Sequence, residues 1–367
     1  MQPLLLLNIG IALVPALLLL ALFDRFEAFN LVRFPKFIVL LGVGAMLAGL
    51  GYAVNGALMA ALPLDFPAYS SFVAPIVEEL LKASPIIFLF ARNKIGFKID
   101  AAIIGFTIGA GFSIAENAYH LYLFPSAEVG TWLVRGLGTA VMHAGATALF
   151  AVVSHELTDE QAEAKAAHYR FKPWLFIPGL AAAAVMHAGF NMFADHPLQL
   201  MFLAFTIVPL SLFAVLSIGE NAARQWMLAD NKVHEELLAD LEDGDFAKSE
   251  IGQAVCAIAD KFNEGLRQEV FDYIKLHTEI VLRAERLLLL RGEGERGEPD
   301  EEDRARFERL RILEANIGRA GLRALRPLLH FSRNDLWEMH LLTASVPKRG
   351  GKRMRSWARP FARRSRR

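Results

Sequence analysis

The stretch SFVAPIVEELLKASPIIFLF, residues 71–90, decides the fold because it places two acids and a lysine inside an otherwise apolar run. Glu116 lies in a second such run, AAIIGFTIGAGFSIAEN at 101–117, and His143 and His187 each lie in a hexapeptide AVMHAG. A charged side chain at the centre of a bilayer costs about 2.5–3.5 kcal/mol on insertion scales. Ionisable residues at such positions are therefore expected to meet and to serve a function.

The apolar runs are long enough to cross a membrane. Residues 1–218 are almost continuously apolar, whereas residues 219–367 are rich in charge. A membrane-spanning helix needs about 20 apolar residues. We therefore expect an all-α fold, a polytopic membrane helical bundle of about seven transmembrane helices, at residues 3–23, 37–61, 71–91, 101–124, 131–154, 174–195 and 198–218.

The loops between these spans alternate in charge. Those at 24–36, 92–100 and 155–173 carry Lys or Arg, and those at 62–70, 125–130 and 195–197 carry neither. Because cytoplasmic loops are enriched in Lys and Arg, this alternation predicts an outer N-terminus and a cytoplasmic C-terminal region. We expect a multi-pass protein of the inner (plasma) membrane.

This orientation gives each polar residue a depth. Glu78 lies about 10 Å below the outer end of its span, from a rise of 1.5 Å per residue. Glu116 and His187 each fall eight residues before an outer end, and His143 lies nearer the midplane. Residues at one depth on four spans predict a single site in the outer half of the membrane.

The spacing within the motifs suggests a division of roles. Lys82 follows Glu79 by three positions and Glu78 by four, so it can hold one carboxylate ionised and leave the other free for proton transfer. His187 and Asn191 share a helix face, where they can donate hydrogen bonds to a developing oxyanion.

Two further expectations concern the surroundings of these residues. Small residues beside the histidines, such as Ala144, Gly145, Ala188 and Gly189, should let helices approach closely. Arg135, near the outer end of its span, is expected to extend to the membrane interface.

Four motifs together resemble the PrsW family of intramembrane proteases, which is related to the CAAX prenyl proteases. They are EELLK at 78–82, FSIAEN at 112–117, HAGAT at 143–147 and HAGFN at 187–191. Each motif is weak alone, but the four occur in the family's order on four consecutive predicted spans.

The resemblance implies roles for the matched residues. Glu78, of the Glu78–Glu79 pair, would be the general base, and Glu116 would help to bind the attacking water. His187 and Asn191 would stabilise the oxyanion. The resemblance gives His143 a place in the site without a defined role. Three other residues of the motifs, Lys82, Phe112 and Asn117, are expected to support the site.

The resemblance also implies a substrate class. Members of the family act on membrane-anchored regulators such as anti-sigma factors, on the extracytoplasmic side. Prenyl proteases have an imidazole where this chain has Glu116, which argues against prenylated substrates. The expected partners are a membrane-anchored protein substrate and the lipid bilayer, with no nucleic acid.

Alternatives remain open. Glu78, Glu116, His143 and His187 are all residue types that bind zinc, so a zinc-dependent protease stands beside the metal-free glutamate mechanism, which the resemblance favours. Intramembrane carboxylates and histidines also form proton relays, and Pro75 and Pro85 flank the EELLK motif, as in the broken helices of transporters. A proton-coupled transporter is therefore the second function class, and a structural membrane scaffold is the third.

The charged half is expected to be a helical region at 219–346 followed by a disordered tail at 347–367, and it shows no catalytic constellation. Its single cysteine, Cys256, excludes an intramolecular disulfide. The tail is basic and could bind anionic lipid at about 1 kcal/mol per residue. The predicted helices lie at about 220–242, 247–291, 301–331 and 334–345.

Overall fold

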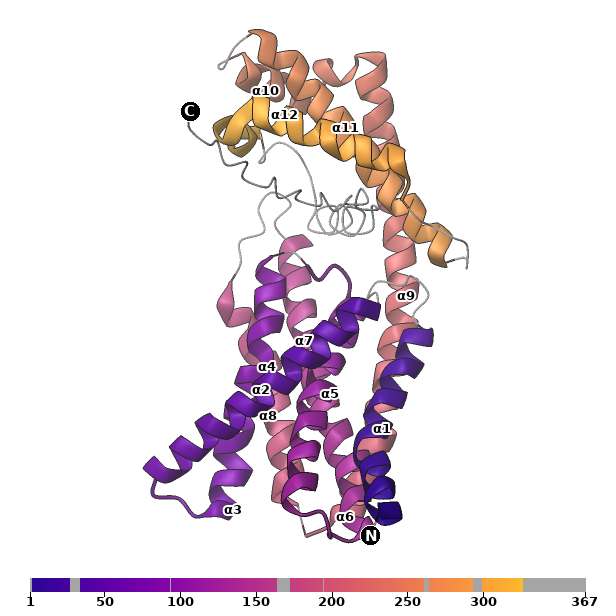
Figure 1. Ribbon diagram of the computed structural model, residues 1–367. Coiled ribbons are helices and arrows are strands. Elements are labelled where there is room, and N and C mark those ends of the chain that lie inside the picture. Colours follow the sequence, from indigo (N-terminus) through magenta and orange to yellow (C-terminus); the bar gives the residue numbers. More distant parts are fainter. Residues whose placement is uncertain are drawn as a thin grey trace, which may run out of the picture.

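The computed structural model describes residues 2–26, 34–92, 94–163, 172–193, 195–260, 264–292 and 299–325. Among these residues it contains helices and no strand, so the all-α expectation is confirmed. The helices of the N-terminal part form a bundle, and the C-terminal helices gather beyond one end of it (Figure 1). The bundle consists of α1 (Gln2–Phe26), α2 (Phe34–Ala61), α3 (Phe66–Ala68), η1 (Tyr69–Val73), α4 (Ala74–Ala91), α5 (Lys98–Leu123), α6 (Val129–Leu133), η2 (Val134–Thr139), α7 (Ala140–Glu163), η3 (Pro173–Phe176), α8 (Ile177–Met192) and the first part of α9 (Pro197–Asp243).

Six segments in the described part of the chain are long and apolar enough to cross a membrane. The predicted span at 71–91 is not among them, because α4 holds Glu78, Glu79 and Lys82 within 18 residues. This helix nevertheless lies within the bundle and packs against α2, α7 and α8 (Figure 1). A helical membrane bundle is therefore confirmed, with apolar segments at 5–23, 35–61, 98–123, 129–158, 173–192 and 197–219.

Helix α5 forms the centre of the bundle. It packs on α1 and α2 and, most extensively, on α7. A Cβ atom at Gly109 would come 2.5 Å from the carbonyl oxygen of His143, and one at Gly105 would come 2.6 Å from that of Thr147. Only glycine permits such close contact between the two backbones. The contact brings His143 of α7 close to the part of α5 that carries Glu116.

Two segments of π-helix interrupt the spans near the same end of the bundle. One is η1, which leads into α4, and the other is η2, which leads into α7. Helix α4 itself continues through Pro85, which lacks the N–H that would bond to Leu81. The hydroxyl of Ser84 donates to the Leu81 carbonyl at 2.8 Å instead, so the backbone stays satisfied without a broken helix.

The helix connections sort into two ends. Lys98 at the start of α5 forms an ion pair with Glu156 of α7, so two of the predicted basic loops lie at one end. At the other end, Asn8 donates to the carbonyl of Ala127, in a loop without Lys or Arg. The C-terminal helices lie beyond the basic end (Figure 1). The alternation of loop charge is thus an alternation between the two ends of the bundle.

The last membrane segment and the first helix of the charged region form one helix. Helix α9 runs for 47 residues and ends at Gly244, whose φ of +78° suits glycine. The single helix predicted for 247–291 is wrong. The chain instead forms η4 (Phe246–Lys248), α10 (Glu250–Ala259) and α11 (Glu264–Gly292), and Ser249 caps α10 by accepting from the N–H of Gly252 at 3.0 Å.

This division gives the charged region its own apolar core. Buried side chains of α10, α11 and α12 (Glu301–Leu325), among them Val255, Ile274 and Leu310, pack together. The end of the helix predicted for 301–331, the whole helix predicted for 334–345 and the basic tail lie outside the described residues. The structure therefore supports a helical region after the bundle.

Candidate active site

The two adjacent carboxylates of α4 have different surroundings. Lys82 Nζ lies 2.6 Å from Glu79 Oε1, and both side chains are buried. Glu78 is 17% exposed and accepts a hydrogen bond from Asn55 Nδ2 at 3.1 Å. Lys82 therefore pairs with Glu79, three positions before it, and not with Glu78, four positions before it. Of the two carboxylates, Glu78 is the one that water can reach.

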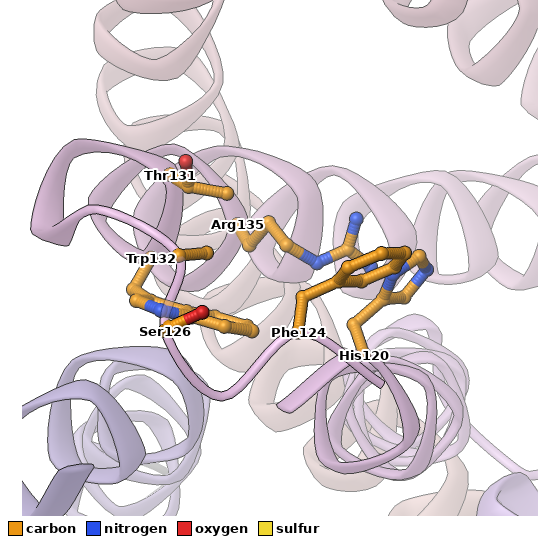
Figure 2. A pocket seen from close by; sticks show the side chains of 7 residues that line it. His120, Phe124, Ser126, Thr131, Trp132 and Arg135 are labelled. Carbon is orange, nitrogen blue, oxygen red and sulfur yellow. The ribbon is translucent and has the colours of Figure 1, made fainter. Parts of the chain in front are cut away.

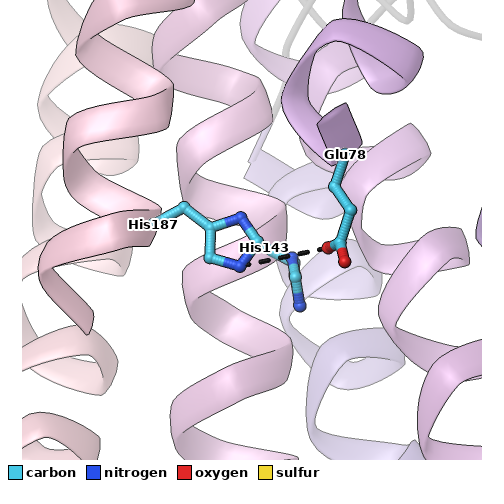
Figure 3. Close-up of side chains that lie close together, drawn as sticks. All are labelled: Glu78, His143 and His187. Carbon is cyan, nitrogen blue, oxygen red and sulfur yellow. Dashed lines mark ion pairs between the residues drawn. The ribbon is translucent and has the colours of Figure 1, made fainter. Parts of the chain in front are cut away.

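His187 of α8 connects these two carboxylates. Its Nδ1 lies 2.9 Å from Glu79 Oε1, and its Nε2 lies 3.9 Å from Glu78 Oε2 (Figure 3). Because the Glu79 carboxylate can only accept, we assign the ring proton to Nδ1. The Nε2 lone pair of a neutral His187 then faces Glu78.

His143 of α7 joins the second half of the site to the first. Its Nδ1 lies 2.9 Å from Lys82 Nζ, and its Nε2 lies 2.9 Å from Glu116 Oε2. The lysine ammonium can only donate, so Nδ1 accepts and Nε2 carries the proton toward Glu116. The His143 and His187 rings meet edge to face, with centroids 4.6 Å apart. His143 thus bridges α4 and α5, a position for which the motifs gave no role.

Glu116 has a second partner that the sequence analysis placed elsewhere. Arg135 of η2 donates from a terminal guanidinium nitrogen to Glu116 Oε1 at 2.9 Å and from Nε to Asn117 Oδ1 at 3.0 Å. The expectation that Arg135 extends to the membrane interface is therefore wrong. Its side chain is 18% exposed and turned toward α5, because an acid lies within reach there.

The three predicted supporting residues hold this arrangement in place. Lys82 Nζ lies 4.5 Å from the centre of the Phe112 ring, a cation–π contact, and the same ring packs against His143. Asn117 donates to the backbone carbonyls of Ala12 and Arg135, at 2.9 and 3.3 Å, and so ties α5 to α1 and η2.

Asn191 lies apart from the carboxylates. Its Nδ2 donates at 2.9 Å to the carbonyl of Ser70 in η1. The structure therefore brings together six of the predicted residues and joins Asn191 to the neighbouring backbone. The six are Glu78, Glu79, Lys82, Glu116, His143 and His187.

Two residues of the site were not predicted. Tyr69 of η1 donates from its hydroxyl to Asn55 Oδ1 at 2.9 Å, which fixes the amide that binds Glu78. Asn55 could have been found from the sequence, because it is a polar residue within the apolar run of α2. Tyr69 could not, because it reaches Asn55 only through the turn of η1.

Comparison with protein families identifies the family of this chain. A family model described as PrsW family intramembrane metalloprotease matches residues 34–218. The chain belongs to the PrsW family. No curated protein and no solved structure matched it. As a PrsW protein with a bundle of apolar helices, it is an intramembrane peptidase that acts within a lipid bilayer on a membrane protein substrate.

In this PrsW protein, a cavity of about 260 Å³ lies beside the Glu116 side of the charged cluster (Figure 2). Arg135 belongs to its lining and also binds Glu116, so the cavity lies next to the charged cluster. It is at the end of the bundle whose loops lack Lys and Arg. Its other lining residues are His120, Phe124, Ser126, Ala127, Thr131 and Trp132.

The family's description as metalloproteases can be tested against the donor set. Glu78, His143 and His187 each offer an atom such that all three lie within 4.8 Å of one another (Figure 3). Two histidines and one glutamate are a ligand set of catalytic zinc sites. Glu79, bonded to the far nitrogen of His187, resembles the carboxylates that orient zinc-bound histidines. The donor set fits zinc, although His143 would have to give up its contact with Lys82, because Nδ1 holds the lone pair of the neutral ring.

Proposed function

We propose that the chain hydrolyses a peptide bond of a membrane-anchored protein with a water molecule activated by Glu78. The observation that carries the proposal is the distribution of charge. Among the ion pairs of the described residues, Glu79 has Lys82 and Glu116 has Arg135, while Glu78 faces only the imidazole of His187. A carboxylate without a fixed cation is free to take a proton.

The proposed water lies between Glu78 and His187. The 3.9 Å gap between Oε2 and Nε2 lets one water donate a hydrogen bond to each atom. As the water oxygen attacks the peptide carbonyl, Glu78 takes the proton and then passes it to the leaving amine. Glu79, through its contact with His187 Nδ1, holds the imidazole in the tautomer that this step needs.

The remaining residues are proposed to position the reacting groups. His143 and Arg135 hold Glu116 beside the water site. His187 with Nδ1 protonated is an acceptor toward Glu78, so it does not supply the predicted oxyanion hydrogen bond in this state. Asn191 can supply that bond if its amide changes partner from Ser70 to the substrate.

A zinc-dependent form of the same reaction is the second candidate, favoured by the Glu78, His143 and His187 donor set. A zinc ion bound there would acidify a water molecule and polarise the peptide carbonyl. Glu79 and Glu116, each beside the other ring nitrogen, would then serve to orient His187 and His143.

The side of the membrane and the substrate class also belong to this proposal. Loop charge favours a cytoplasmic position for the basic end of the bundle, and the cavity beside Arg135 lies at the opposite end. Cleavage near the extracytoplasmic face of the inner membrane follows. Membrane-anchored regulators such as anti-sigma factors are the proposed substrates, and the basic tail is proposed to bind anionic lipid.

The decisive variant is Glu78→Gln, which keeps the shape and removes the base. Purified protein in liposomes is assayed on candidate single-span substrates, and we expect kcat/KM to fall by about 100-fold or more. Glu128→Gln, an exposed acid at the same end of the bundle, is the matched control and should cleave like wild type. Undiminished cleavage by Glu78→Gln would overturn the mechanism.

Two further assays separate the alternatives. Activity lost with a chelator and restored by zinc would select the zinc-dependent form. Proton flux that Glu78→Gln abolishes, with no cleavage by wild type, would select transport.

A further inference from the structure

A second histidine–carboxylate cluster lies in the charged region, far along the chain from the site in the bundle. It consists of Asp230 and His234 of α9 and Glu285 of α11. His234 Nδ1 lies 3.2 Å from Glu285 Oε1 and 3.7 Å from Asp230 Oδ2. The Glu285 side chain is fully buried, and those of His234 and Asp230 are 6% and 22% exposed.

The local geometry aims all three groups at one point. Asp230 and His234 are four positions apart, so they share a face of α9. Glu285 faces them from α11, and its second oxygen accepts from Asn231 Nδ2 at 3.0 Å. This hydrogen bond fixes the carboxylate orientation and leaves Oε1 directed at His234, as outer-shell groups do for metal ligands.

The cluster joins two acids to one imidazole across two helices. Three cations of the same helices form ion pairs outside it: Lys232 with Glu236, Lys275 with Glu242, and Arg283 with Asp300 and Asp303. Glu285 is fully buried, and a buried carboxylate costs several kcal/mol unless it is compensated.

We propose that Asp230, His234 and Glu285 bind a divalent transition-metal ion of the zinc class. Two ligands at about 2.0–2.1 Å from a tetrahedral metal lie about 3.4 Å apart, and the distances of 3.2 and 3.7 Å fall on either side of that value. Three protein ligands leave the fourth position to water. One nitrogen and two oxygens suit zinc better than magnesium, which prefers an all-oxygen shell.

The site gives the metal a structural consequence. Helix α9 is continuous from the membrane segment at 197–219 to Asp243, and α11 is the longest helix of the charged region. A metal held by both would clamp the charged region onto the last membrane helix. The clamp is independent of the reaction proposed for the bundle.

The test measures zinc bound per chain in the purified full-length protein, without a polyhistidine tag. Wild type and the variants Asp230→Asn, His234→Gln and Glu285→Gln are equilibrated with Zn²⁺ and freed of excess metal. We expect each variant to hold one equivalent of zinc per chain less than wild type. Any zinc bound in the bundle is present in both proteins and does not affect this difference. Excess Mg²⁺ should not displace the zinc. Glu235→Gln on α9 and Glu279→Gln on α11 are the matched controls and should bind like wild type.

A second readout guards against variants that fail to fold. Zinc should raise the melting temperature of wild type and of both controls, and the part of that rise due to this site should be lost in Asp230→Asn, whose side chain is the most exposed of the three. Equal zinc content in wild type and all three variants, or no binding at micromolar Zn²⁺, would overturn the proposal. His234 would then be a protonated imidazole between two acids.

Discussion

Two clusters of histidine and carboxylate side chains lie in the described part of the chain, and they differ in how their carboxylates are held. In the bundle, three glutamates face Lys82 and Arg135, with 2.6 and 2.9 Å contacts to Glu79 and Glu116. In the charged region, Asp230 and Glu285 contact the imidazole of His234, at 3.7 and 3.2 Å. The same residue types are therefore assembled in two electrostatic settings.

The difference indicates what each cluster can do. Fixed cations hold two of the three bundle carboxylates in place, so that cluster can assemble without a metal and leave one reactive carboxylate, Glu78. The cluster between α9 and α11 gathers two carboxylates around one imidazole, a donor set that suits a divalent ion. The predictions below change the cations, since these distinguish the two settings.

The largest effect is expected when the buried cation of the bundle is removed. Lys82→Met leaves Glu79 buried without its partner, which should lower the free energy of unfolding by about 3–5 kcal/mol. Unfolding in mixed detergent micelles measures the change. The double variant Lys82→Met with Glu79→Gln should recover much of the loss, because no charge is then left uncompensated.

The matched control for this prediction is Lys98→Met. The pair of Lys98 with Glu156 has side chains that are 35% and 48% exposed, so its loss should cost at most about 1 kcal/mol. Equal small losses in Lys82→Met and Lys98→Met would show that the buried pair is not what holds the bundle site together.

How much of this was predictable depends on the distance in sequence between partners. Glu79 and Lys82 are three residues apart, so their contact followed from helix geometry. Glu78, Glu116, His143 and His187 were placed together by depth and by motif order. The prediction for Arg135 was wrong because its contact with Glu116 depends on how η2 and α5 are oriented relative to each other. The spacing of residues along one helix does not contain this information.

The second cluster was missed for a related reason. Asp230 and His234 show the i,i+4 spacing of paired ligands, but that spacing is common on charged helices. The third residue, Glu285, is 51 positions after His234 and belongs to a helix that was predicted to start 17 residues too early. Only the break between α10 and α11 brings it to the face of α9.

A fixed cation can be introduced into the second cluster. His234→Lys would reproduce the role of Lys82, an ammonium beside two carboxylates. We expect it to abolish the zinc-dependent stabilisation, about 2.7 kcal/mol at a zinc concentration 100 times Kd, while its metal-free stability stays near that of wild type. Melting curves with and without Zn²⁺ measure both. His234→Gln should instead lose stability in both conditions, and a zinc response retained by His234→Lys would contradict the comparison.

The smallest effect is expected at Arg135, because its pair with Glu116 is partly solvated, with side chains 18% and 28% exposed. Arg135→Gln should lower stability by about 1 kcal/mol. We expect kcat/KM to fall by about tenfold, because one of the two groups that position Glu116 is lost and His143 remains. Arg135→Lys keeps the charge but not the fork that reaches Glu116 and Asn117 together, so its kcat/KM should lie between those of the wild type and of Arg135→Gln. If Arg135→Gln cleaved at the wild-type rate, the cation of η2 would be structural, and the difference between the two clusters would rest on Lys82 alone.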